Sequence, residues 1–175
     1  MKKGIVQVYT GDGKGKTTAS VGLAIRSAGQ GLNVGFFQFF KPPVSGEIKI
    51  FQRIDNIKFY SYFQKHPAFQ KFNNNDIENY KKKFSKVLEE ILEEIKKEKF
   101  DVAILDEILI ALRDGFLGED ELIDFIEKKP EYVEIVLTGR YKLNEKLKKK
   151  VQLITEMKNI KHPYPEISAR KGIEF

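Results

Sequence analysis

Residues Ile5–Thr18 read IVQVYTGDGKGKTT, an apolar run of β type that leads through a glycine-rich turn into a helical pattern. We expect a strand over Ile5–Tyr9 and a helix from about Thr17 to Ala28. A strand, a glycine-rich turn and a helix in this order are typical of proteins that bind nucleotide phosphates. The backbone N–H groups of such a turn can cradle an anion, and glycines let the backbone approach it closely. The sequence therefore predicts an anion-binding loop before the first helix.

The side chains of this loop suit a nucleoside triphosphate. Lys16 can reach the β- and γ-phosphates, and the Thr17 hydroxyl is placed to ligate Mg²⁺. The helix that starts at Lys16 directs its positive dipole end toward the phosphates, and Lys14 adds another cation. The common pattern G-x-x-x-x-G-K-[ST] has glycine where this chain has Thr10, so a glycine turn that binds nothing is the alternative. The predicted nucleotide-binding residues of the loop are Gly11, Asp12, Gly13, Lys14, Gly15, Lys16, Thr17 and Thr18.

Further apolar runs alternate with helical patterns, which is typical of a parallel sheet covered by helices. The clearest helix is Tyr80–Lys97, whose apolar side chains recur at helical spacing on one face. Another is expected near Glu119–Lys128, before a proline. With 175 residues and no linker-like segment, we expect one α/β domain over residues 1–175, similar to P-loop NTPases of the RecA-like type, with helices on both faces of the sheet. The other expected strands are Asn33–Phe40, Ile57–Tyr60, Asp101–Asp106, Glu134–Leu137 and Leu153–Met157.

Two groups of charged residues follow strands at the edge where the phosphate loop is expected. Asp106 and Glu107 end the run VAILDE and can hold Mg²⁺ directly or through water. One of them could instead orient a water for hydrolysis, or cap the following helix. Arg140, in the run LTGR, can bind phosphate or a substrate carboxylate with its planar fork. A surface salt bridge at a helix start is the alternative for this arginine.

Composition limits the remaining classes of function. The chain carries 31 basic and 25 acidic residues, a formal net charge of +6, which suits an anionic ligand or a nucleic acid without choosing between them. The absence of cysteine excludes disulfides and cysteine-ligated metal, and His66 and His162 are too far apart in sequence to indicate a histidine metal site. No apolar run approaches the ~20 residues of a membrane span, and the N-terminus does not resemble a signal peptide. We therefore expect a cytoplasmic protein without a membrane segment.

Taken in order, the motifs resemble the P-loop family of ATP:corrinoid adenosyltransferases, and together they span nearly the whole chain. GDGKGKTT alone is a generic phosphate loop, but its combination with LTGR and the C-terminal motif is specific. The resemblance is carried by YTGDGKGKTTAS at Tyr9–Ser20, QFFK at Gln38–Lys41 with Gly46-Glu47, LDE at Leu105–Glu107, LRDGFL at Leu112–Leu117, KKPE at Lys128–Glu131, LTGR at Leu137–Arg140, and EMKNIKHPYPEISARKGIEF at the C-terminus.

This resemblance implies transfer of the 5′-deoxyadenosyl group of ATP to the Co(I) of a reduced corrinoid, with release of triphosphate. Because the cobalt is the nucleophile, the protein would supply positioning and electrostatics. Lys14, Lys16 and Glu107 would be the catalytic residues, Arg140 would join the nucleotide-binding set, and Thr17, Glu107 and Asp106 would hold Mg²⁺.

The family also implies a corrinoid site and partner proteins. Lys41 and Glu47 are the expected corrinoid contacts on the loop after the second strand. The composition of the aromatic-rich segment Phe63–Asn75 indicates a lid beside the phosphate site, and a surface loop with partly buried aromatics is the alternative. In the family, aromatic side chains displace the lower axial ligand of cobalt, a role that would fall to Phe69 or Phe72 here. A flavodoxin-like reductase would supply the electron, and a homodimer is expected.

Two other classes of function compete with this interpretation. In an ATP hydrolase or kinase, Glu107 would activate water or a hydroxyl and ADP would form. A nucleic-acid-binding module would use the net charge and show steeply salt-dependent binding. No clustered arginine and aromatic stripe on an expected strand supports this last class, so we expect no nucleic-acid partner.

Overall fold

The computed structural model describes residues 3–67, 72–162 and 166–174. These residues form a six-stranded sheet in the order β3-β2-β4-β5-β1-β6, and every strand pair in it is parallel. One strand, β5, therefore separates the strand before the phosphate loop (β1) from the strand before the acidic pair (β4). The strands are β1 (Val6–Thr10), β2 (Val34–Phe39), β3 (Ile57–Tyr62), β4 (Val102–Asp106), β5 (Glu134–Thr138) and β6 (Leu153–Glu156).

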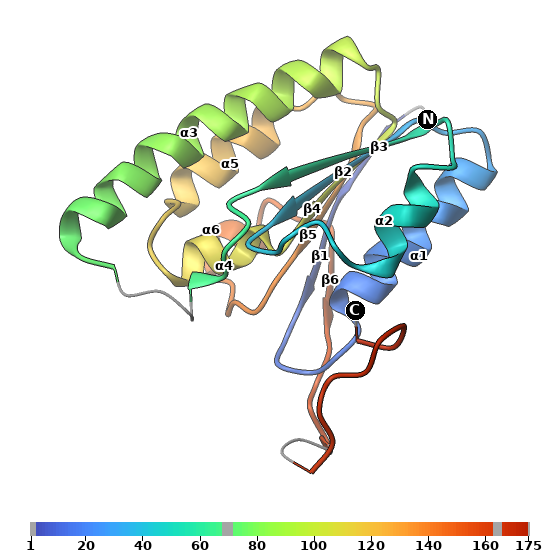
Figure 1. Ribbon diagram of the computed structural model, residues 1–175. Helices are drawn as coiled ribbons and strands as arrows, with labels where there is room; N and C mark the ends of the chain where they lie inside the picture. The colour runs from blue at the N-terminus through green and yellow to red at the C-terminus, as the bar shows by residue number, and fades with distance from the viewer. Residues whose placement is uncertain (1–2, 68–71, 163–165, 175) are drawn as a thin grey trace.

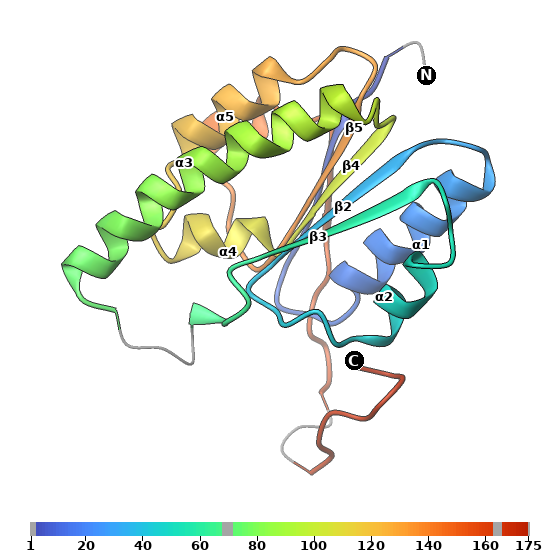
Figure 2. The ribbon, with the colours of Figure 1, turned by 45° about the horizontal axis from the view of Figure 1, so that its top comes forward.

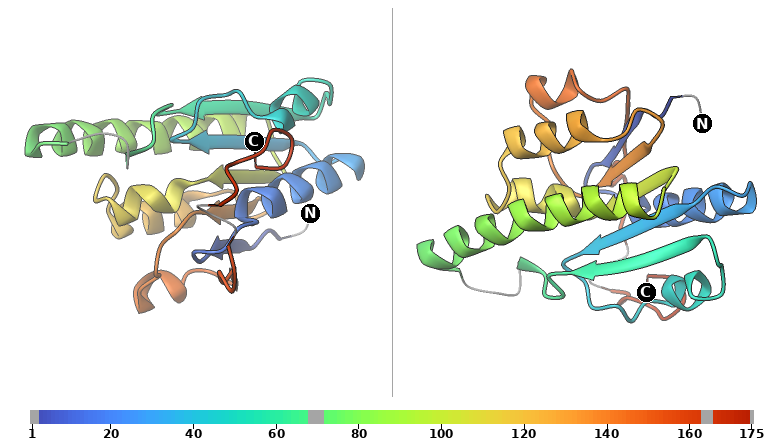
Figure 3. Two further views of the ribbon diagram at one scale, coloured as in Figure 1. Left: turned by 60° about the horizontal axis from the view of Figure 1, so that its bottom comes forward. Right: turned by 90° about the horizontal axis from the view of Figure 1, so that it is seen from above.

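Helices cover both faces of this sheet, as Figures 1 and 3 show, so the expected α/β fold class is confirmed. One face carries α1 and α2, and the opposite face carries α3 and α5. The short helices α4 and α6 contribute buried residues to the same core cluster as α3 and α5. The helices are α1 (Lys16–Gly29), α2 (Gly46–Phe51), α3 (Asn74–Lys97), α4 (Ile108–Arg113), α5 (Glu119–Lys128) and α6 (Glu145–Lys148).

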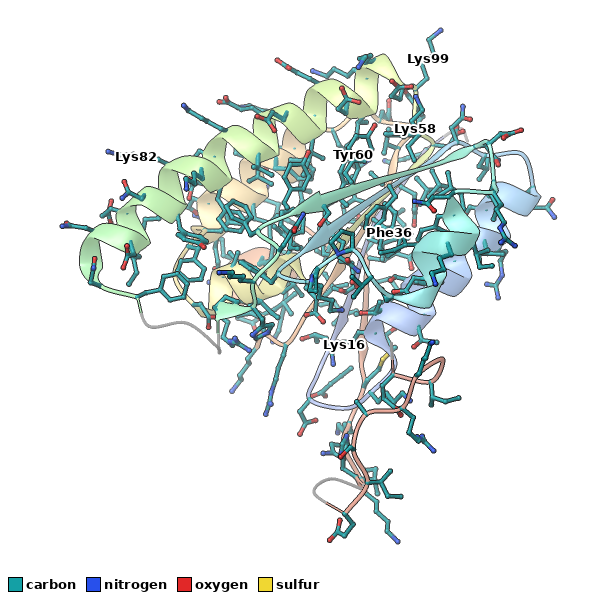
Figure 4. All side chains as sticks on the ribbon, viewed as in Figure 1. Lys16, Phe36, Lys58, Tyr60, Lys82 and Lys99 are labelled. Atoms are coloured by element: carbon teal, nitrogen blue, oxygen red, sulfur yellow. The ribbon has the colours of Figure 1, made fainter. Side chains whose placement is uncertain are left out.

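The interior strand β2 shows how the sequence fills the core on both faces of the sheet. Successive side chains of a strand point to opposite faces. Phe36 therefore packs against Phe51 of α2, with ring centroids 5.0 Å apart, and Figure 4 shows it on that side of the sheet. Its neighbour Phe37 stacks on Tyr60 at 4.7 Å in the other core cluster. This double burial explains why β2 is an almost continuous apolar run.

The structure extends several expected elements and adds three short helices. Helix α3 begins at Asn74, six residues before the expected start, because Asn73 caps it and exchanges hydrogen bonds with Asp76 in a capping box. Part of the predicted lid is therefore helical. The helices α2, α4 and α6 have only 6, 6 and 4 residues, and elements this short carry too few apolar repeats for a periodicity to be recognised.

The carboxyl ends of the strands meet at one edge of the sheet, where the chain turns sharply after each strand. The residues that follow the first five strands all have positive φ angles, and three of them are not glycine. Such backbone conformations cost free energy for non-glycine residues and tend to cluster at functional sites. In the views of Figures 1 and 2 this edge lies beside the start of α1 and the C-terminal segment. The five residues with positive φ that follow the strands are Gly11, Phe40, Phe63, Glu107 and Gly139.

Candidate functional site

The glycine-rich turn after β1 forms a loop that ends at the N-terminus of α1. Gly15, with φ of 121°, precedes the first helical residue and provides no side-chain cap, so the first N–H groups of the helix remain available to a ligand. Lys16 folds back over the loop, and its Nζ donates hydrogen bonds to the carbonyl oxygens of Gly11 (2.8 Å) and Gly13 (2.7 Å). Burial lowers the pKa of Lys16, and Glu107 opposes this effect. The loop therefore holds a partly desolvated ammonium group at a helix N-terminus, which is a favourable setting for a phosphate group.

The C-terminal segment after β6 holds this loop in place. The Gly13 amide donates to the carbonyl oxygen of Met157 (2.7 Å), and the Asn159 amide donates to Asp12 Oδ1 (3.1 Å). The Asn159 amide also keeps the pKa of Asp12 below its usual value. A Cβ atom at Gly11 would lie 2.3 Å from the Met157 carbonyl oxygen. Gly11 is therefore required for packing against Met157 as well as for its positive φ.

The acidic pair lies directly opposite the start of α1. Asp106 is completely buried; its Oδ1 accepts a hydrogen bond from the Thr138 hydroxyl (2.7 Å) and its Oδ2 one from the Thr17 hydroxyl (3.2 Å). The Thr138 hydroxyl also accepts the Glu107 amide hydrogen (2.9 Å). Two strands and the start of α1 thus meet here, and Thr138 of β5 fixes both acidic residues at the end of β4.

Glu107 stands at the N-cap position of α4, but its side chain makes no capping hydrogen bond. Its Oε1 instead lies 3.2 Å from Lys41 Nζ. Glu107 is therefore the N-cap residue of α4, as the capping alternative predicts, but its carboxylate does not cap the helix. This carboxylate faces the phosphate loop, where the sequence analysis expected it.

Lys41 lies in the same cluster rather than at a separate site. Its Nζ is 3.0 Å from Thr17 Oγ1 and 3.3 Å from Asp106 Oδ2, in addition to its contact with Glu107. Burial lowers the pKa of Lys41, but Asp106 and Glu107 together raise it above its usual value. The ammonium group of Lys41 therefore stays charged between two carboxylates and a threonine hydroxyl.

A cavity of about 650 Å³ opens beside this cluster. The phosphate loop, the start of α1, the segment 41–47 and Glu107 line it. Its remaining wall comes from the C-terminal turn, Gly172–Glu174, which lies far away in sequence. Glu174 pairs with Lys14 at 2.9 Å and with Arg170 at 3.0 Å, and these hydrogen bonds lower the Glu174 pKa to about 2. The cation that Lys14 contributes to the loop is thus already paired with a carboxylate of the same chain.

We expect Glu174→Gln to strengthen triphosphate binding slightly. The glutamine cannot neutralise Lys14, so this lysine no longer has to leave an ion pair when an anion arrives. Because exposed ion pairs are weak, the gain should not exceed about fivefold in the dissociation constant. Titration with tripolyphosphate in a calorimeter measures the effect. Weaker binding in the variant would mean that Glu174 helps to hold the ligand instead.

Arg140 also lies beside the phosphate loop. It is exposed, and among the described residues it forms no ion pair, so the surface salt bridge considered as an alternative is not observed. It lines a second cavity of about 770 Å³ that touches the loop at Gly11 and Asp12 and also contains Arg113 and Lys142. Arg140 therefore lies beside the loop at a different cavity from Lys14.

Of the residues expected to contact a corrinoid, Lys41 and Glu47 line the first cavity, and Phe72 lies apart from them. Lys41 belongs to the acidic cluster described above, and Glu47 lines the first cavity, where its Oε1 accepts a hydrogen bond from Ser45. Phe72 packs against Tyr80 and Phe116, with ring centroids 5.2 and 5.0 Å apart. It lines neither of the two cavities that flank the loop. Phe69 lies outside the described residues.

Sequence reasoning missed three contributors to this site. Thr138 was quoted only as part of the motif around Arg140, although its hydroxyl organises both acidic residues. Gly139 approaches α4 so closely that a Cβ atom would lie 2.9 Å from Leu109 Cβ. The C-terminal turn was recognised as a family motif, but no local pattern indicates that it reaches the phosphate loop. Such contacts depend on where the chain returns after β6.

The oxygen atoms around Lys41 fit a divalent cation. Thr17, Asp106 and Glu107 supply a hydroxyl and two carboxylates, which are the hard ligands that Mg²⁺ prefers. The Lys41 ammonium group among them shows that this set already holds a cation. Across the described ranges, no cluster of three or more histidine, cysteine or acidic residues could hold a metal without help. The remaining ligands would have to come from water and phosphate oxygens.

Together, the six-stranded parallel sheet and the helices on both of its faces define an α/β protein, with a glycine-rich loop between β1 and α1. The chain belongs to the ATP:corrinoid adenosyltransferase family: the family model for "ATP:corrinoid adenosyltransferase BtuR/CobO/CobP" matches residues 2–175. The resemblance derived from the motifs is therefore confirmed, and the chain is identified as an adenosyltransferase.

Curated relatives support this assignment over nearly the whole chain. A corrinoid adenosyltransferase of Sinorhizobium sp is 34% identical over 179 residues, covering 99% of this chain and 81% of the relative. One of Pseudomonas aeruginosa is 29% identical and covers 99% and 85%. The corrinoid adenosyltransferase CobA of Salmonella typhimurium is 26% identical and covers 99% and 87%.

The structure also addresses the question of membrane segments. Within the part of the chain that is described, no helix has the length and apolar character needed to cross a bilayer. The longest helix, α3, has 24 residues but is strongly amphipathic, with lysine and glutamate on its outer face.

Proposed function

We propose that this protein transfers the 5′-deoxyadenosyl group of ATP to the Co(I) of a reduced corrinoid and releases triphosphate. In this reaction the cobalt attacks C5′ of the ribose, and the bond from C5′ to the triphosphate oxygen breaks. The leaving triphosphate accumulates negative charge, so catalysis requires cations placed around it. The observation that carries the proposal is the group of three lysines, Lys14, Lys16 and Lys41, around one loop and one cavity in a chain of this family.

The phosphate loop provides the triphosphate site in this proposal. Lys16 exchanges its two carbonyl partners for phosphate oxygens, and loop amides between Gly11 and Thr18, other than the Gly13 amide that is bonded to Met157, donate to the same group. Lys14 leaves Glu174 and neutralises a further charge. Arg140 approaches the loop from the second cavity. These groups hold the leaving group in one position, which favours the attack geometry.

Mg²⁺ would be held by Thr17, Glu107 and Asp106 together with phosphate oxygens. The bound ion would supply electrostatic stabilisation of the leaving triphosphate. Thr138 orients Asp106, and Glu107, at a turn with positive φ, has its carboxylate beside the loop. These two residues therefore maintain the ligand geometry.

The corrinoid and the partners complete the proposal. Glu47 at the first cavity is a corrinoid contact, and an aromatic residue of the segment 63–72, Phe69 or Phe72, acts beneath the corrin ring. A flavodoxin-like protein supplies the electron that makes Co(I). In this proposal, residues 1–175 form one domain. The protein is located in the cytoplasm and forms a homodimer.

The first test is an anaerobic incubation with Mg-ATP and chemically reduced cobalamin. We expect a light-sensitive alkylcobalamin spectrum and one free triphosphate for each corrinoid converted. Formation of ADP without a spectral change would contradict the proposal and would indicate a hydrolase or kinase.

The variant Glu107→Gln separates metal binding from base catalysis. A neutral amide is a weaker Mg²⁺ ligand than a carboxylate, so the Mg²⁺ concentration for half-maximal adenosyl transfer should rise about ten- to hundredfold. Excess Mg²⁺ should restore most of the rate. Lost turnover at every Mg²⁺ concentration, with ATP still bound, would instead indicate that Glu107 acts as a base.

A further inference from the structure

The ammonium group of Lys41 occupies the position that the oxygen ligands define for a divalent cation. Its Nζ lies 3.0 Å from Thr17 Oγ1, 3.3 Å from Asp106 Oδ2 and 3.2 Å from Glu107 Oε1. These are the three side chains that the proposed function assigns to Mg²⁺. A second cation cannot enter this set while the ammonium group remains there, because like charges at this distance repel strongly.

The chain fixes Lys41 in this place from both sides. The preceding residue, Phe40, has a φ of 58°, and its buried ring packs against Phe63, Phe84 and Phe116. The residue that follows is Pro42, whose ring restricts the backbone. The main chain of Lys41 is therefore anchored, and its flexible side chain reaches across the end of β4.

A buried carboxylate explains why the cation is needed. Asp106 is completely buried, and an unpaired charge in such a position is costly. Lys41 neutralises it in the nucleotide-free protein, and its side chain remains 34% exposed. The side chain of Lys41 also lines the first cavity, so it has space to move on that side.

We propose that Lys41 is an internal counter-cation that holds the metal position in the nucleotide-free protein and turns to the triphosphate when Mg-ATP binds. The inference rests on the proposed function for the identity of the anion. Because a metal ion must replace the Lys41 ammonium group, a free divalent cation binds weakly. Metal and triphosphate bind strongly only together, since the triphosphate then accepts the displaced ammonium group. Lys41 then becomes the third lysine on the leaving group, a role beyond corrinoid contact.

Binding of Mn²⁺ to the nucleotide-free, full-length protein tests the first half of this proposal. In Lys41→Met the three oxygen ligands are no longer occupied, so Mn²⁺ affinity measured by electron paramagnetic resonance should increase about tenfold. Lys41→Arg keeps the charge, and its Mn²⁺ affinity should stay as low as in the parent protein. The exposed Lys49 on α2 lines neither cavity, and Lys49→Met is the matched control.

The second half is tested with tripolyphosphate at a Mg²⁺ concentration that saturates the metal site in each variant. Lys41→Met should bind it about tenfold more weakly than Lys49→Met does, because one charged donor is missing. An unchanged Mn²⁺ affinity in a folded Lys41→Met protein would overturn the inference. A gain that persists in Lys41→Met/Asp106→Asn would also overturn it, since the metal would then bind elsewhere. Both Mn²⁺ results are independent of adenosyl transfer, so a failure of the proposed reaction is recognised separately.

Discussion

Lys16→Ala should reduce adenosyl transfer about 10²- to 10³-fold, because a preorganised charged donor on the leaving triphosphate is lost. Lys16 is the first residue of α1, and its Nζ already contacts two loop carbonyl oxygens. The alanine side chain leaves both the phosphate charge and these carbonyl groups without a partner. Calorimetric titration with Mg-ATP and the anaerobic spectral assay measure binding and turnover separately.

A suitable control is Lys82→Ala. Lys82 is exposed on α3, and Figure 4 shows it well away from Lys16 and the phosphate loop. This variant lowers the net charge by the same amount and should retain parent activity. Equal losses in the two variants would mean that overall charge, and not the position of Lys16, governs ATP binding.

Gly11→Ala should destabilise the fold and remove nucleotide binding together. The φ of 99° at Gly11 strains any residue with a Cβ atom, and this atom would lie 2.3 Å from the Met157 carbonyl oxygen. Strain and displacement of the backbone together should cost about 3 kcal/mol in the free energy of unfolding. For a chain of this size, that lowers the midpoint of thermal unfolding by about 10 °C. Calorimetry and ATP titration of the same sample test both effects.

The matched control is Gly22→Ala, in the exposed face of α1. A Cβ atom there meets nothing within 4 Å, and alanine favours a helix over glycine by about 1 kcal/mol. This variant should therefore unfold at a slightly higher temperature and bind ATP normally. A normal unfolding midpoint and normal ATP binding in Gly11→Ala would show that the loop does not require its contact with Met157.

Local patterns were enough to predict the fold class and the strand–loop–helix unit. The strand–loop–helix unit is contiguous in sequence: an apolar run, the glycines and the Lys16-Thr17 pair follow one another. The conformation of each part therefore depends mainly on its neighbours in the chain, which a sequence pattern records. The helix α5 was predicted at its observed bounds, Glu119–Lys128, because its periodicity ends at a residue before proline. Likewise, Asp106 and Glu107 had to lie at the carboxyl edge once β4 was recognised.

The contacts across the site depend on the order of strands, which no local pattern contains. The placement of β5 between β1 and β4 puts the Thr138 hydroxyl against Asp106. The turn at Phe40 sends Lys41 to the acidic pair, a contact that no local pattern indicates, and the corrinoid contact implied by the resemblance stays a prediction.

The C-terminal motif is the clearest case. Its sequence indicated the family, yet its contact between Glu174 and Lys14 joins residues that are 160 positions apart. Short-range propensities fix strands, turns and helices, whereas such a contact forms only after burial of the apolar faces has set the path of the whole chain. The sequence alone therefore specified the phosphate loop, and the packing of the sheet determined which charged side chains surround it.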